Sequence, residues 1–169
     1  MLIDANGTWT VETTIAFLKG IESIPLVWIK EPLVESDRAW RGLHQWIQGT
    51  AYKDTWLAGG EQYNDFPMLD KLEADGILDV RLTGIVGHGF TSWRGRMPRL
   101  VQTGTLASPH YRGSGLSTVY TPHLVGGLGN GCTVEGVFCS HEHVDFGENV
   151  IRDGKVHLSA KPGFGLPLR

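Results

Sequence analysis

Three acidic residues stand where successive apolar runs of the chain end. Asp4 lies in "LIDAN", Glu31 in "LVWIKEP" and Glu61 in "WLAGGEQY". If these runs are neighbouring parallel strands, their carboxyl ends meet at one edge of a sheet and the three carboxylates crowd together. Crowded anions repel unless a cation lies among them, and a hard divalent ion prefers carboxylate oxygens. The pattern favours a divalent metal site, against the alternative that each acid is a solvated loop residue.

Lys30 directly precedes Glu31 and introduces an opposite charge at the same strand end. Its side chain could simply extend past the strand end into water. Its ammonium could instead stand between Asp4 and Glu61 as a tethered cation, because a lysine between two carboxylates keeps its charge. It could also act as a general base, which requires a lowered pKa that flanking acids oppose.

The elements that would carry these residues alternate between short β-rich runs and stretches of helical periodicity. Such alternation is typical of βα units that feed a parallel sheet. Within "SDRAWRGLHQWI", the residues Trp40, Leu43 and Ile47 align on one helical face. Pro98 and Pro122 are expected to kink or interrupt two later helices. The predicted strands cover residues 2–4, 26–30, 55–59, 77–82, 105–108 and 132–138.

The fold class predicted from this alternation is α/β, with about six βα units of a partial (β/α)8 TIM-type barrel. A closed barrel needs eight strands and about 250 residues, and this chain has 169. After Phe138 the pattern changes, and "VIRDGKVHL" holds two short β runs around Asp153-Gly154, a hairpin turn signal.

Composition and charge exclude several classes of partner. The net charge is -3 and the basic residues form no run, so we expect neither nucleic-acid binding nor binding to an anionic membrane surface. No apolar stretch approaches the length of about 20 residues that spans a membrane, so a cytoplasmic protein is expected. Cys132 and Cys139 are expected to be free thiols. Cys139, His141 and His143 alternate like zinc ligands, but no second ligand pair has zinc-finger spacing.

Several motifs, taken in order, resemble a known family over nearly the whole chain. They are "LIDANGTWT", "WIKEPL", "LAGGEQY", "GILDVRL", "SPHY" and "DGKVHLSAKPGFGLPL". Their order and spacing resemble the C-terminal barrel domain of the enolase superfamily, most closely its mandelate racemase and acid-sugar dehydratase branch. The resemblance implies a lyase or isomerase in which three strand-end acids hold Mg²⁺. The ion binds the substrate carboxylate and stabilises the enediolate formed when a base removes the α-proton.

The resemblance also assigns roles to individual residues. Asp4 and Glu61 match the first and third metal ligands, and Asn6 matches a position that often touches substrate. His110 in "SPHY" matches an acid/base histidine, and Glu135 in "TVEGV" matches an acid that contacts the substrate carboxylate.

The sequence departs from the family pattern at three places. Lys30 stands at the second metal ligand, so the next acid, Glu31, is the candidate in its place. Gly84 stands where the family has an aspartate that orients the histidine, so His110 is expected to lack its carboxylate partner. His88, predicted on the loop after the strand 77–82, could replace that aspartate. The lysines that the family carries on its second strand are absent, and with them the usual second acid/base; Lys30 is the remaining candidate.

The resemblance places residues 1–138 in an incomplete barrel, strands 3–8, and residues 139–169 in a C-terminal segment that returns to the capping domain. The expected function is Mg²⁺-assisted α-proton abstraction from a small carboxylate, a sugar acid. The alternative is a non-catalytic fragment or degenerate paralogue that retains the fold and binds a small carboxylate. Open sheet edges predict a homo-oligomer.

Overall fold

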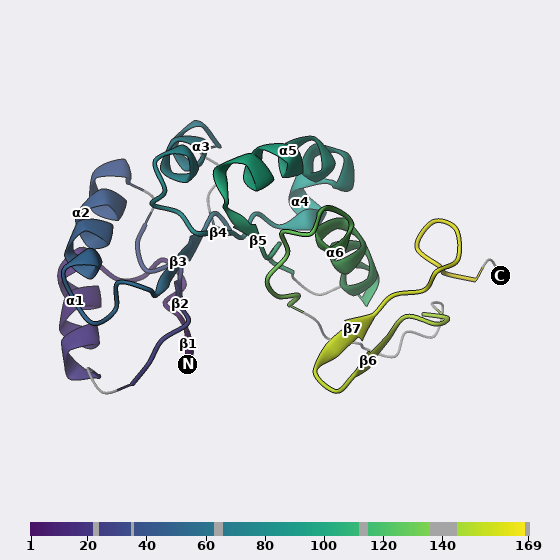
Figure 1. Cartoon of the computed structure of the whole chain (residues 1–169), viewed down its shortest axis with the longest axis horizontal. Coiled ribbons are helices and arrows are strands. Elements are labelled where there is room, and N and C mark those ends of the chain that lie inside the picture. Colours follow the sequence, from purple (N-terminus) through teal and green to yellow (C-terminus); the bar gives the residue numbers. More distant parts are fainter. Residues whose placement is uncertain (22–23, 35, 63–65, 112–114, 136–144, 168–169) are drawn as a thin grey trace. The chain divides into compact units, whose positions relative to one another are not determined.

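Helices and short strands alternate along the chain in the computed structural model (Figure 1). The structure describes residues 1–21, 24–34, 36–62, 66–111, 115–135 and 145–167. The chain divides into two compact units, residues 1–83 with 103–105 and residues 84–102 with 106–169. Each unit has its own hydrophobic core. The predicted boundary after residue 138 stays a prediction.

Four parallel strands form the sheet of the first unit. In spatial order these are β1 (Leu2–Asp4), β2 (Trp28–Lys30), β3 (Trp56–Gly59) and β4 (Val80–Arg81). The parallel arrangement predicted from the βα pattern is confirmed. The strands β2, β3 and β4 are shorter than predicted, and the buried residues Leu26 and Leu78 lie in the loops that precede β2 and β4. In this register Asp4 pairs with Lys30 and Lys30 with Ala58, so neighbouring strands present these positions side by side.

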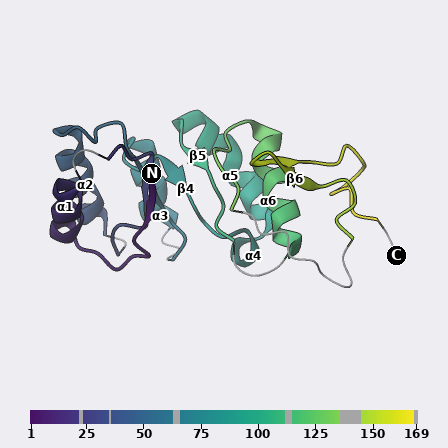
Figure 2. The ribbon, with the colours of Figure 1, turned by 90° about the horizontal axis from the view of Figure 1, so that it is seen from below.

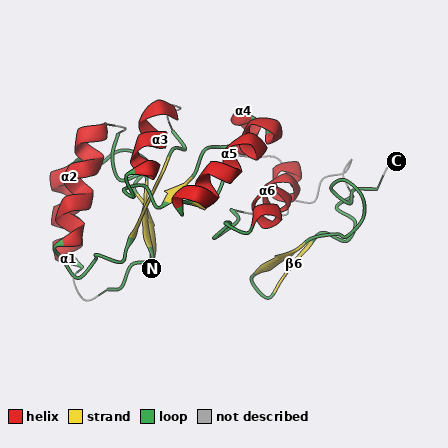
Figure 3. Ribbon diagram, turned by 45° about the horizontal axis from the view of Figure 1, so that its top comes forward, coloured by secondary structure: helices red, strands yellow, loops and turns green. Residues whose placement is uncertain are grey.

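Each of the first three strands is followed by a helix, coloured red in Figure 3. The helices are α1 (Val11–Gly20), α2 (Asp37–Gln48) and α3 (Phe66–Ala74). Thr10 caps α1 because its hydroxyl accepts the N–H of Thr13 at 3.2 Å. The helices α1 and α2 lie side by side (Figure 2).

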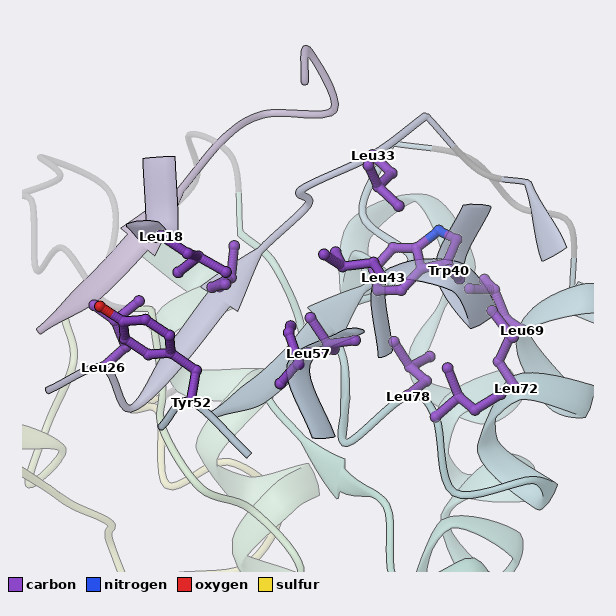
Figure 4. Packing of buried hydrophobic residues seen from close by; sticks show 13 residues of the cluster. Leu18, Leu26, Leu33, Trp40, Leu43, Tyr52, Leu57, Leu69, Leu72 and Leu78 are labelled. Carbon is purple, nitrogen blue, oxygen red and sulfur yellow. The ribbon is translucent and has the colours of Figure 1, made fainter. Parts of the chain in front are cut away.

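The core of the first unit is formed by side chains from these helices, from the sheet and from the loops that connect them (Figure 4). The helical face predicted for α2 is confirmed, since Trp40, Leu43 and Ile47 are all buried. A Cβ on Gly59 would lie 2.7 Å from the Trp40 ring, closer than a side chain can approach. Glycine at this position therefore lets the Trp40 ring pack against the end of β3, two residues before Glu61.

The second unit begins with helices. Its strand β5 (Leu106–Ala107) follows the βα pattern of the first unit, and its other described strands form a C-terminal hairpin. The unit contains α4 (Ile85–His88), all but the last residue of α5 (Phe90–Thr103), β5 and α6 (Gly115–Leu128). Its core includes Trp93 and Met97 of α5 and Leu124 of α6.

Two prolines lie inside helices of the second unit without ending them. Pro98 lies within α5 and Pro122 within α6, so the interruption expected at Pro122 is wrong, whereas the kink expected at Pro98 stays a prediction. An internal proline costs about 3 kcal/mol through its lost hydrogen bond and steric clash. In α5, the side chains of Trp93, Met97 and Leu100 are fully buried, and burial of one such side chain contributes about 1.5–3 kcal/mol. Packing therefore outweighs the cost of the proline.

One parallel bridge, between Ala107 and Gly131, lies just before the strand predicted at 132–138. Residues 132–135 are not strand, and residues 136–138 lie outside the described residues. The predicted hairpin is confirmed as β6 (Val150–Arg152) paired antiparallel with β7 (Lys155–His157). Its turn residues Asp153 and Gly154 have φ of 53° and 71°, the left-handed pair that a two-residue hairpin turn requires.

Within the part of the chain that the structure describes, no helix combines the length and the apolar composition needed to cross a membrane.

Candidate functional site

The ends of β1, β2 and β3 bring together one lysine and three acids, here called the strand-end cluster: Asp4, Lys30, Glu31 and Glu61. The Lys30 Nζ lies 2.7 Å from Asp4 Oδ2 and 2.5 Å from Glu61 Oε2. The strand register explains the first contact, since Asp4 and Lys30 are paired positions. Gly60, with φ of +96°, turns the chain after β3 and presents Glu61. The side chains of Lys30 and Glu61 are 9% and 4% exposed, and that of Asp4 is 38% exposed.

The ammonium of Lys30 is held in its charged form. Burial lowers its pKa, but hydrogen bonds to Asp4 and Glu61, together with their negative charges, outweigh that effect and raise the pKa above its usual value. A raised pKa is the opposite of what a general base needs. Of the three interpretations of Lys30, the contacts match the tethered cation.

The backbone bends at Glu31 and turns its carboxylate toward the loop that carries Glu61. Glu31 has φ of 45°, and its Oε1 accepts the backbone N–H of Glu61 at 2.7 Å. The side chain is fully buried, and its Oε2 has no hydrogen-bond partner among the described residues. Burial raises the pKa of Glu31 to about 7, with the charge of Glu61 adding to the effect, while the bond from the Glu61 N–H and the charge of Lys30 oppose it. Glu31 is therefore a carboxyl group that takes up a proton near neutral pH.

Asn6 lies on the loop that follows β1 and is exposed. Its φ is 49°, and its N–H donates to Asp4 Oδ1 at 2.9 Å. The amide of Gln62 donates to Asn6 Oδ1 at 3.5 Å, a long contact. Asp4 thus uses one oxygen to hold the loop at Asn6 and the other to bind Lys30.

The residues of this cluster do not fit Mg²⁺ as they stand. Mg²⁺ requires oxygen ligands in a near-octahedral shell. Here both oxygens of Asp4 are engaged, and the ammonium of Lys30 occupies the space between Asp4 and Glu61. In the described portion of the chain, no three His, Cys, Asp or Glu side chains form a group that could hold a metal ion. No reaction step is therefore assigned to a metal here.

Arg81 is a buried residue beneath this cluster that the sequence did not single out. Its guanidinium lies 2.6 Å from Glu73 Oε1 and donates to Thr83 Oγ1 at 2.8 Å. A Cβ on Gly60 would lie 3.3 Å from the Arg81 side chain, so Arg81 packs under the turn that carries Glu61. The run "GILDVRL" contains a signal for this ion pair, because the charge of Arg81 inside an apolar strand requires a buried partner of opposite charge.

In the second unit, His110 is paired with a carboxylate. Its Nδ1 lies 2.8 Å from Glu135 Oε2, and that same oxygen accepts the backbone N–H of Tyr111 at 2.9 Å. A hydrogen bond of 2.7 Å between the hydroxyls of Ser108 and Thr133 links the two segments that carry them. The expectation that His110 lacks a carboxylate partner is wrong. The parallel bridge between Ala107 and Gly131 brings together the segments that carry His110 and Glu135.

Neither Gly84 nor His88, the two positions considered for the missing aspartate, takes the place of that aspartate beside the His110 ring in the contacts described below. Gly84 is the N-cap of α4, and a Cβ there would lie 3.5 Å from the His110 carbonyl oxygen. His88 is the last residue of α4, so its predicted position on a loop is wrong. This short helix lies between two glycines. Gly84 before it is extended, and Gly89 after it has φ of 85°. The His88 ring lies edge-on to Trp93, with ring centroids 6.4 Å apart.

Of the cysteine and histidine residues in the region 132–143, the structure describes only Cys132. Cys132 is a free thiol whose pKa is raised by burial, as expected for an inert cysteine. Cys139, His141 and His143 lie outside the described residues.

Solved structures that are similar to this chain include relatives at slightly more than one quarter sequence identity. A galacturonate dehydratase from Geobacillus sp., solved with D-galacturonate and 5-keto-4-deoxy-D-galacturonate, is 27% identical with a TM-score of 0.84. That match covers 98% of this chain and 44% of the dehydratase. A mandelate racemase/muconate lactonizing protein from Geobacillus sp. Y412MC10, solved with magnesium and tartrate, is 26% identical with a TM-score of 0.82 and covers 98% and 42% of the two chains.

An enolase protein from environmental sequencing of the Sargasso Sea shares the fold at 15% identity, with a TM-score of 0.80 over 99% of this chain and 45% of its own. The chain thus spans less than half the length of these solved relatives. No curated protein matches it. The α/β architecture with parallel strands matches part of the TIM-type barrel of these relatives, as predicted. The family described as "Enolase C-terminal domain-like" matches residues 1–169, and the chain belongs to that family.

Proposed function

We propose that the protein acts on a small hydroxy-carboxylate of the sugar-acid class by removing the proton next to the carboxylate, with His110 as the acid/base. The observation that carries this proposal is the pair of His110 and Glu135, 2.8 Å apart. The family membership and the sugar-acid ligand of the galacturonate dehydratase support the substrate class.

The pairing with Glu135 gives His110 the arrangement that proton transfer needs. The negative charge of Glu135, 2.8 Å from Nδ1, favours the tautomer that carries its proton on Nδ1, in which Nε2 is the basic atom. The carboxylate also stabilises the imidazolium that forms when Nε2 takes a proton. Glu135 is itself held by the N–H of Tyr111, so the pair is oriented before a ligand arrives.

Magnesium would bind the substrate carboxylate and stabilise the enediolate in members of this family whose acids hold it. The strand-end cluster does not fit that ion with Lys30 in place, so the proposal does not depend on Mg²⁺.

Exchange of the α-proton with solvent tests the proposal directly. The protein in its full-length form is incubated with D-galacturonate, tartrate and related sugar acids in D₂O, and deuterium at the α-carbon is followed by NMR. We expect exchange, and a loss of about 100-fold or more in His110→Asn. His157→Asn, on β7 of the same unit, is the control and should keep the wild-type rate. Equal rates in wild type and His110→Asn would exclude His110 as the acid/base.

A second candidate function is non-catalytic binding of a small carboxylate. It is favoured by one observation, the ammonium of Lys30 between Asp4 and Glu61. Calorimetric binding of a sugar acid without α-proton exchange or product formation would favour this candidate over the first.

Self-association is proposed as well, because β1 is an edge strand of the first unit's sheet and Leu2 on it is 53% exposed. Light scattering that gives the mass of a monomer at all concentrations would contradict this.

A further inference from the structure

The position of Lys30 is that of a cation shared by two acids. Lys30 lies on β2, between β1 and β3, and its ammonium contacts Asp4 on one side and Glu61 on the other. The side chains of Lys30 and Glu61 are almost fully buried, so water does not screen their charges. The ammonium therefore relieves the repulsion between the two carboxylates, the same task that a bound metal ion would perform.

Lys30, Asp4 and Glu61 together carry the same net charge without a metal as three acids carry with one Mg²⁺. A lysine carries one positive charge, and a glutamate with Mg²⁺ bound to it carries the same net charge. Lys30 with Asp4 and Glu61 thus has the total charge of a three-acid site loaded with Mg²⁺. A divalent ion added to the present cluster would have to displace the ammonium or lie against it.

The ammonium differs from the metal in what it offers a ligand. It has three N–H donors, and two of them face Asp4 and Glu61. One donor remains for the oxygen of a ligand, where Mg²⁺ would offer several coordination positions. This donor suits a single carboxylate oxygen, bound by a charge-assisted hydrogen bond.

We infer that Lys30 is a built-in replacement for the magnesium ion, so that the strand-end cluster does not bind Mg²⁺ and binds a small carboxylate without it. The carboxylate half of this inference rests on the proposed substrate class, whereas the metal half does not.

Titration with Mg²⁺ alone tests the metal half. The full chain and Lys30→Glu are titrated by calorimetry, and the melting temperature of each is measured with and without Mg²⁺. We expect no binding by wild type at about millimolar Mg²⁺ and an affinity about tenfold higher or more in Lys30→Glu, where a third carboxylate joins Asp4 and Glu61. Lys53→Glu makes the same charge change at an exposed position and should gain nothing.

Lys30→Gln covers the case in which Lys30→Glu fails to fold. It removes the cation and adds no charge, so Mg²⁺ should raise its melting temperature but not that of wild type. If wild type binds Mg²⁺ as tightly as Lys30→Glu, or if neither Lys30 variant responds to Mg²⁺, the inference is overturned.

Tartrate binding in the presence of EDTA tests the carboxylate half. Wild type should bind with the same affinity whether EDTA or Mg²⁺ is present, and Lys30→Met, of similar length but uncharged, should lose about tenfold or more. Binding that requires Mg²⁺, or that is unchanged in Lys30→Met, refutes this half. Neither titration involves turnover, so failure of the proposed proton abstraction would be seen separately, in the deuterium exchange.

Discussion

Glu31 makes the stability of the first unit depend on pH, and Glu31→Gln should remove that dependence. The carboxyl group is fully buried, and one of its oxygens has no hydrogen-bond partner in the part of the chain that the structure describes; its pKa is about 7 in the folded protein, against 4.5 for an ordinary glutamate. Between these two values the folded state holds the proton and the unfolded state does not. The free energy of unfolding therefore falls as pH rises through this range and levels off above pH 7.

The size of the effect follows from the two pKa values. Each unit of difference corresponds to 1.36 kcal/mol, so the shift of Glu31 destabilises the folded state above pH 7 by on the order of 3 kcal/mol relative to pH 4. Glutamine at position 31 stays neutral and can still accept the N–H of Glu61 through its amide oxygen. Glu31→Gln should thus match wild type near pH 4 and exceed its stability by up to about 3 kcal/mol at pH 8.

Urea unfolding measured from pH 4 to pH 8 provides the assay, with tryptophan fluorescence as the signal, because five of the six tryptophans lie in the first unit. Glu12→Gln serves as the control. Glu12 is exposed and its pKa is lowered by hydrogen bonds to its own backbone and to Thr10, so this variant should not gain stability as pH rises. If Glu31→Gln and wild type lose stability in parallel between pH 4.5 and 7, the carboxyl of Glu31 is not the buried group described.

Three further changes test other contacts of the structure. Glu135→Gln should slow α-proton exchange by about 10- to 100-fold, because His110 loses the carboxylate that lies 2.8 Å from its Nδ1 and orients the ring; an unchanged rate would exclude this role of the pairing. Arg81→Met should destabilise the first unit by about 3–5 kcal/mol in urea unfolding, because it removes the buried ion pair between Arg81 and Glu73, and simultaneous Glu73→Leu should recover part of the loss. Gly59→Ala should cost about 1–3 kcal/mol, since the new methyl group meets the Trp40 ring, whereas Gly42→Ala on the exposed side of α2 should not destabilise.

The repeating part of the fold could be predicted from the sequence because it depends on periodicity. The burial of Trp40, Leu43 and Ile47 follows from their helical spacing, and the hairpin follows from Asp153-Gly154, whose conformation few other pairs adopt.

Strand lengths and the prolines were predicted less well because they depend on packing. Leu78 is buried like a strand residue, but it lies in a loop. Pro98 is tolerated inside α5 because other residues of that helix are buried. Neither fact is visible in a local pattern.

The chemistry of the site was predictable in type and not in arrangement. The residues at the strand ends are those expected. The contacts of Lys30 match one of its three interpretations, that of a tethered cation between Asp4 and Glu61. The positive φ of Glu31, which turns its carboxylate toward the Glu61 N–H, breaks the strand alternation that sequence reasoning assumes. The contact of Glu135 with His110 joins segments 25 residues apart and follows from their pairing, not from either segment alone.

The burial of Lys30 also has a consequence for covalent labelling. Acylating reagents attack the neutral amine, and Lys30 combines a raised pKa with a side chain that is only 9% exposed and contacts two carboxylates. Exposed lysines such as Lys19, Lys53 and Lys155 should therefore react first. Lys30 becomes reactive only when the ends of β1, β2 and β3 separate, so its rate of modification measures how often this edge of the sheet opens in the folded protein.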